Sequence, residues 1–102
     1  MLSSDNQSDV LSAPERLVTE TRLEFRRAAL EHVERAAHAT APRIYVDLAA
    51  TKDIDASGLG VLVLLQKRAR EKMIATRLLH PGKSVRQMLL LTKLDYLFEL
   101  KD

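Results

Sequence analysis

The sequence predicts a single α/β domain in which a small mixed β-sheet of about four strands packs against three to four helices. Along the 102 residues, segments with helical periodicity alternate with short apolar runs typical of strands. A chain of this length supports one hydrophobic core. Apolar residues make up 46% and charged residues 29%, a balance typical of globular domains.

The N-terminal region has the composition of a tail rather than that of a folded element. Residues 1–13 contain many Ser, Asp, Asn and Gln, so we predict a flexible tail there and a folded domain over residues 14–102. Short strand fragments are expected at residues 10–11 and 17–18, on either side of Pro14. The N-terminal strand of the sheet is therefore expected to be short or missing.

The first helix is predicted from its capping residues and its apolar face. Thr21 and Glu24 have the spacing of a capping box, in which each side chain bonds a free backbone N–H of the first turn. The helix is expected to run to about Ala39, before Pro42. Its apolar residues form one broad arc, which Arg26 interrupts.

A strand, a loop and a second helix are predicted in the middle of the chain. Apolar side chains alternate along residues 43–48, which is typical of a strand with one buried face. Residues 49–56 form the loop that follows, and residues 57–73 the second helix. Ser57 is expected at the N-cap of that helix, because serine is favoured there.

The C-terminal part repeats the alternation of strand and helix. Residues 76–80 are predicted to form a strand that Pro81 ends. Ser84 and Gln87 have capping-box spacing and open a third helix. Residues 96–100 are predicted to form a closing strand.

Enzymatic chemistry is not supported by any residue spacing in the chain. A phosphate-binding loop ending at Ser84 would need glycine where Arg77 stands, and a nucleophile elbow at Ser57 would need glycine where Asp55 stands. The three histidines lack the spacing of metal ligands, and the absence of cysteine excludes thiolate metal sites and disulfides. We therefore expect no catalytic residues, no metal and no cofactor.

Charge and hydropathy also exclude some partners. The net charge is only +2, and the few aromatic residues leave little for base stacking, so we expect no direct contact with nucleic acid. The longest apolar run, residues 59–65, is far shorter than a membrane span of about 20 residues. No signal-peptide pattern opens the chain, and the protein is expected to be cytoplasmic without membrane insertion.

The segment around Ser57 is the strongest functional signal. Asp55 precedes the serine by two residues, and Gly58 and Gly60 follow it closely. A hydroxyl at the positive end of a helix dipole, on a backbone that a partner can approach closely, is suited to carry a phosphoryl group. The alternative is that Ser57 only caps the helix and that the glycines only tighten the turn.

Asp55-Ala56-Ser57-Gly58-Leu59-Gly60, placed after a strand that ends in Asp47-Leu48, resembles the signature of STAS domains. Within that family the chain is most similar to bacterial anti-sigma factor antagonists. The likeness extends from the first predicted helix to Phe98.

This resemblance implies a phosphorylation switch. Ser57 stands at the position that an anti-sigma factor with serine kinase activity phosphorylates, and a serine phosphatase removes the group. The unphosphorylated antagonist sequesters the kinase and frees the sigma factor. The resemblance implies that the neighbours of Ser57 face the partner: Asp55, Ala56, Gly58, Leu59 and Gly60.

Two further expectations concern assembly. The short N-terminal strand leaves a sheet edge uncovered, which favours a homodimer or a complex formed through that edge. The alternative function is a constitutive structural subunit, as in a STAS-containing signalling scaffold or a lipid-transport ABC complex, in which Ser57 is a helix cap only.

Overall fold

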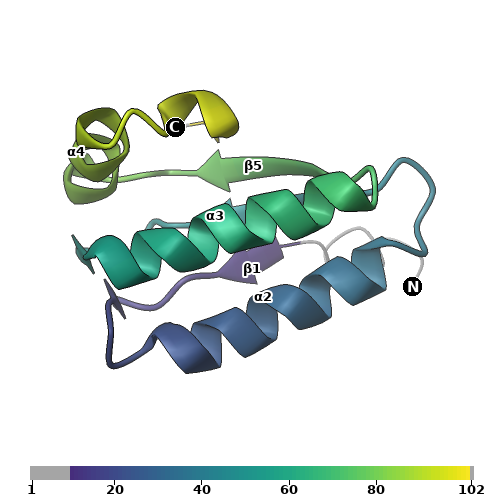
Figure 1. Ribbon diagram of the computed structural model, residues 1–102, viewed down its shortest axis with the longest axis horizontal. Helices are drawn as coiled ribbons and strands as arrows, with labels where there is room; N and C mark the ends of the chain where they lie inside the picture. The colour runs from purple at the N-terminus through teal and green to yellow at the C-terminus, as the bar shows by residue number, and fades with distance from the viewer. Residues whose placement is uncertain (1–9, 102) are drawn as a thin grey trace.

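The computed structural model describes residues 10–101 and confirms the predicted α/β fold class (Figure 1). A four-stranded sheet has the order β1-β3-β5-β6, and a separate two-stranded ladder joins β2 to β4. All of these pairings are parallel, whereas the sequence predicted a mixed sheet. The strands are β1 (Val10–Ser12), β2 (Arg16–Leu17), β3 (Arg43–Asp47), β4 (Asp53–Ile54), β5 (Ala75–Leu79) and β6 (Glu99–Lys101).

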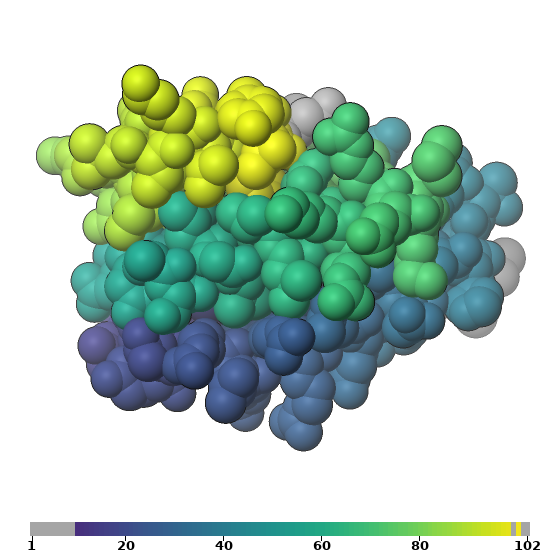
Figure 2. Space-filling model, viewed as in Figure 1, coloured from purple at the N-terminus to yellow at the C-terminus, as the bar shows by residue number. Residues whose placement is uncertain are grey.

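Helices α2 and α3 lie side by side over one face of the sheet and run in the same direction (Figure 1). The space-filling view shows that they form much of the face turned to the viewer, α2 in blue and α3 in teal and green (Figure 2). Their N-termini therefore meet at one end of the molecule. The helices are α2 (Arg22–Ala36), α3 (Ala56–Glu71), α4 (Lys83–Leu91) and the short 3₁₀ helix η1 (Asp95–Leu97).

The N-terminal strand is present but short, and it begins inside the segment predicted to be a tail. β1 pairs in parallel with β3, with Leu11 opposite Val46. Leu11 and Ala13 are each only 5% exposed, so their burial holds this segment against the domain. The folded part thus starts by Val10 rather than at residue 14, and the remainder of the predicted tail, residues 1–9, lies outside the described residues.

The two predicted capping boxes do not form. Thr21 is the N-cap of α2, but its hydroxyl donates to the carbonyl oxygen of Arg16 (2.7 Å) and accepts from the Val18 N–H (3.0 Å). It therefore closes the turn before the helix instead of bonding the helix itself. In α4 the N-cap is Gly82, and Ser84 is the second helical residue. α2 also ends at Ala36, three residues earlier than predicted.

The closing strand is shorter than predicted. Residues 95–97 form η1, and β6 begins only at Glu99, where it pairs with β5. The Leu97 N–H donates to the Leu94 carbonyl oxygen (3.1 Å), which keeps this segment in a tight turn. The turn allows Phe98, 7% exposed, to enter the core.

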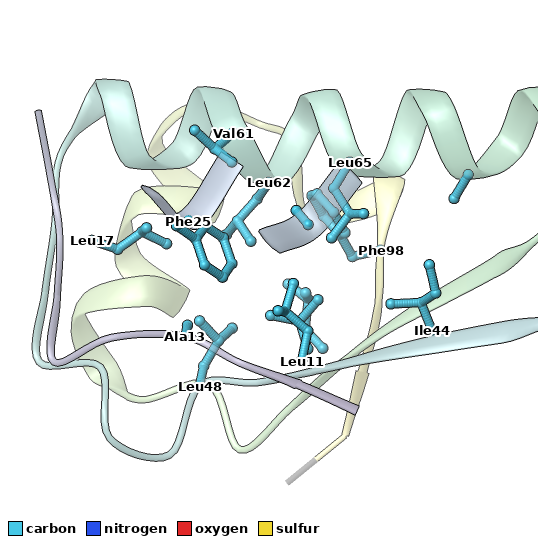
Figure 3. Close-up of a cluster of buried hydrophobic side chains, with 14 of the residues drawn as sticks. Leu11, Ala13, Leu17, Phe25, Ile44, Leu48, Val61, Leu62, Leu65 and Phe98 are labelled. Atoms are coloured by element: carbon cyan, nitrogen blue, oxygen red, sulfur yellow. The ribbon is translucent and has the colours of Figure 1, made fainter. Parts of the chain in front are cut away.

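The core lies between the sheet and helices α2 and α3. Leu62 and Leu65 point from α3 toward Leu11 and Leu48, which come from the sheet side (Figure 3). The fully buried large side chains are those of Leu17, Val33, Ile44, Val46, Leu48, Leu62, Leu65, Leu78, Val85 and Leu89. This packing fixes the start of α3 against β2, where the predicted site lies.

Candidate functional site

Asp55, and not Ser57, caps helix α3. The backbone of Asp55 is extended (φ −118°, ψ −174°), and its carboxylate Oδ1 accepts a hydrogen bond from the Gly58 N–H at 2.9 Å. Aspartate and serine are equally good caps, so the choice is made by the backbone, which turns helical at Ala56. Ser57 is the second residue of the helix, and the prediction that it is the N-cap is wrong.

The segment between β2 and α2 also bonds Asp55. Its Oδ2 accepts from the Thr19 N–H at 3.0 Å and lies 3.2 Å from Thr19 Oγ1. The Asp55 N–H donates to the carbonyl oxygen of Leu17 at 3.3 Å. The N–H of Gly58, followed by the Thr19 groups, lowers the pKa of Asp55 despite partial burial of the carboxyl. The cap is therefore a carboxylate at neutral pH.

The hydroxyl of Ser57 contacts the hydroxyl of Thr19 at 3.0 Å. Thr19 has only one hydroxyl proton, and the Asp55 carboxylate can only accept. Both Thr19 contacts are satisfied when Ser57 donates to Thr19 and Thr19 donates to Asp55. Ser57 is half-buried, and its side chain takes no part in capping the helix.

The other predicted residues divide into exposed and buried ones. Ala56 and Gly60 are exposed, and a β-carbon on Gly60 would meet no atom within 4 Å. Gly58 and Leu59 are buried. A β-carbon on Gly58 would lie 2.7 Å from the carbonyl carbon of Leu17 and closer still to its oxygen, so Gly58 is required for α3 to approach β2.

A groove between α2 and α3 adjoins Ser57. It has a volume of about 390 Å³ and opens to solvent. Arg22, Leu23 and Arg26 line it from α2; the residues that line it from α3 are Ser57, Gly60, Val61 and Leu64. Figure 2 shows these two helices next to each other. Two cationic side chains thus share a groove with the predicted phosphoacceptor.

Thr19, Arg22 and Arg26 also belong to the site, and no sequence motif indicated them there. Thr19 reaches Asp55 and Ser57 across 36 and 38 residues of chain, and no local pattern reports such a contact. Arg26 did leave a signal, because it interrupts the apolar arc of its helix. A charge within an apolar helix face is a reason to look for a functional role there.

Two negative findings hold for residues 10–101. No group of three or more His, Asp or Glu side chains is placed to hold a metal ion. No helix in that range is long and apolar enough to cross a membrane.

Comparisons with known proteins agree with the fold. A family model described as "Mlab, STAS domain" matches residues 1–99. A crystal structure described as that of a candidate anti-sigma factor antagonist from Thermotoga maritima has a TM-score of 0.77 and 25% sequence identity, covering 92% of this chain and 80% of that one. The comparison with curated proteins found no match.

Two other solved structures share the fold at lower identity. An anti-sigma-factor antagonist (STAS) domain protein from Planctomyces limnophilus has a TM-score of 0.80 and 20% identity, covering 91% of this chain and 80% of that one. A sulfate transporter family protein from Wolinella succinogenes has a TM-score of 0.75 and 10% identity, covering 92% of this chain and 75% of that one.

Proposed function

The chain belongs to the STAS domain family, and we propose that it acts there as an anti-sigma factor antagonist switched by phosphorylation of Ser57. The unphosphorylated protein binds and sequesters an anti-sigma factor that is a serine kinase. The kinase phosphorylates Ser57 and is released, and a serine phosphatase resets the cycle. The protein is a cytoplasmic binding module rather than an enzyme.

The observation that carries this proposal is the division of roles between Asp55 and Ser57. Asp55 supplies the helix cap, so the Ser57 hydroxyl is not needed to stabilise the start of α3. Among residues 10–101, its one side-chain partner is Thr19, an exposed residue. A phosphoryl group on Ser57 would displace this single contact and leave the cap intact. This counts against the alternative in which Ser57 serves only as a cap.

The charge near Ser57 explains how one modification releases a partner. A phosphoryl group adds a charge of about −1.5 to −2 at neutral pH. It would lie close to the Asp55 carboxylate, on a surface that a bound partner would have desolvated. A thousandfold loss of affinity requires about 4 kcal/mol, which repulsion and desolvation of this size can supply.

Only those predicted interface residues that are at least partly exposed can contact the kinase directly. Ala56, Gly60 and the half-buried Asp55 and Ser57 form the surface that we propose the kinase contacts. Gly58 and Leu59 act indirectly, because their burial fixes the start of α3.

A second candidate is a constitutive STAS subunit of a scaffold or a lipid-transport ABC complex. One observation favours it: a transporter-family protein shares the fold. In that case the same surface would bind its partner whatever the state of Ser57.

A pull-down from lysate of the native host separates the two candidates. The baits are the unmodified protein, Ser57→Ala, Ser57→Asp and a matched control, Ser84→Asp. Ser84 is exposed and is also the second residue of its helix, so the control adds the same charge at an equivalent helix position. We expect a serine kinase with every bait except Ser57→Asp. Identical partners for all four baits would favour the constitutive subunit.

A further inference from the structure

We propose that Arg22 and Arg26 bind the phosphoryl group of phosphorylated Ser57 within the same chain. This inference rests on the proposed function and deepens it. It assigns a role to the groove between α2 and α3, which lies beside the loop that carries the signature.

The two helices present matching stripes to the groove. Arg22 and Arg26 are four residues apart and so lie on the same side of α2. Ser57, Gly60 and Leu64 recur at intervals of three and four residues along α3 and so share one side of that helix. Gly60 contributes no side chain, and a β-carbon there would meet no atom within 4 Å, so the groove is open at this position.

Both arginines have donors available for an anion. Arg22 Nη1 donates to the Thr19 carbonyl oxygen at 2.9 Å, which holds its guanidinium beside the residue that contacts Ser57. Arg22 retains four further N–H donors, since a guanidinium carries five. Across residues 10–101, Arg26 takes part in no hydrogen bond or ion pair, and it is exposed. Two guanidinium groups match the charge and geometry of one phosphate.

The bound phosphate gives the switch a second way to act. In the unmodified chain both guanidinium groups are available to an acidic group of the partner. After phosphorylation they are occupied by the phosphate, so the groove loses its positive charge. The release of the partner then depends on the arginines as well as on the added negative charge near Asp55.

The test uses the full chain with phosphoserine encoded at position 57, so that no kinase is needed. The pH titration of its phosphorus NMR signal reports the second ionisation of the phosphate, whose ordinary pKa is about 6. We expect a lower midpoint in the otherwise unmodified chain than in Arg22→Gln/Arg26→Gln, because guanidinium groups favour the dianion. Each single variant should give an intermediate midpoint.

Two controls exclude a general charge effect. Arg27→Gln removes the same charge from an exposed position of α2 that does not line the groove, and it should leave the midpoint unchanged. Phosphoserine encoded at position 84 should titrate alike with and without the two arginines. Thermal melting of each variant verifies that it is folded.

Equal midpoints in the unmodified chain and in the double variant would overturn the inference. This result is distinct from a failure of the proposed function. A midpoint that depends on the arginines, together with a pull-down insensitive to Ser57→Asp, would refute the switch but not the phosphate site. A pull-down that responds to Ser57→Asp, with equal midpoints, would refute the phosphate site alone.

Discussion

Replacing Gly58 or Gly60 with alanine tests how the start of α3 is held. Both glycines lie in the first turns of the same helix, two residues apart, and alanine is the better helix former by about 1 kcal/mol at each position. The two sites differ in their surroundings. An added β-carbon at Gly60 meets no atom within 4 Å, whereas one at Gly58 overlaps the backbone of Leu17.

The expected free energies of unfolding follow from this difference. Gly60→Ala should gain about 0.5–1 kcal/mol, since only the helix preference changes. Gly58→Ala forces apart two backbones, so overpacking should cost about 3 kcal/mol, the upper end of its usual range. Subtracting the helix preference of about 1 kcal/mol leaves a net loss of about 2 kcal/mol. Leu17 cannot yield cheaply, because it is fully buried and its carbonyl oxygen accepts from the Asp55 N–H.

Urea denaturation, monitored by far-UV circular dichroism, measures the free energy of unfolding of both variants. In a domain of this size, 1 kcal/mol corresponds to about 4–8 °C in melting temperature, so the two variants should melt about 10 °C or more apart. The variants are matched controls for each other, because each changes one glycine of the same helix. Equal stability of the two would refute the close approach of α3 to β2.

Three further predictions address the site and the N-terminal strand. Thr19→Val should lower the free energy of unfolding by about 0.5–1.5 kcal/mol, because Asp55 and Ser57 each lose a hydroxyl contact, while Thr19→Ser should restore it in the same denaturation assay. The pKa of Asp55 is lower in the folded protein, chiefly because the Gly58 N–H bonds its carboxylate. The Asp55 carboxylate therefore stabilises the fold fully at pH values above its unfolded-state pKa of about 4. This contribution is lost as the pH falls through the lower folded-state pKa. Asp55→Asn should therefore flatten stability measured against pH in this acidic range, and an unchanged slope would contradict the assigned cap. Leu11→Ala should lower the free energy of unfolding by about 2–5 kcal/mol, because Leu11 is buried. Val10→Ala, at a site 39% exposed, should change it little. Small and equal effects of the two substitutions would show that residues 10–13 are not part of the folded domain.

The fold was largely predictable because its elements carry local signals. The alternation along β3 and the apolar arcs of α2 and α3 each require only nearby residues. The strand fragment expected at residues 10–11 is present as β1, but its burial in the folded domain was not predictable because the evidence for it is not local. Leu11 is buried through its pairing with β3, more than thirty residues away in the chain, and the polar composition around it indicated a tail.

Caps and turns were less predictable than the helices they begin. Thr21 is the N-cap of α2 as predicted, although its side chain does not bond the helix. At α3 and α4 the N-caps are Asp55 and Gly82, each two residues before the predicted serine, because tertiary packing decides where the backbone enters the helix. The first helical residue of α3 is set by two contacts with the preceding segment. Gly58 packs against Leu17, and the Thr19 N–H donates to the Asp55 carboxylate. A capping motif in the sequence therefore locates a helix start to within a few residues only.

Only the part of the candidate site that lies in one short segment was predictable. Ser57 and Asp55 belong to one short motif, and the sequence alone indicated them. Thr19 and the two arginines come from a different segment, and only the packing of α2 beside α3 brings them to the serine.

Locating the phosphate is the decisive test of the proposed switch. The protein, recovered from its host together with any bound kinase, is incubated with ATP, and the modified residue is identified by mass spectrometry. We expect a single phosphoryl group on Ser57 and, as it accumulates, release of the kinase. Phosphate on Thr19 or Ser84 instead, or no phosphate while the partner stays bound, would contradict the phosphorylation switch.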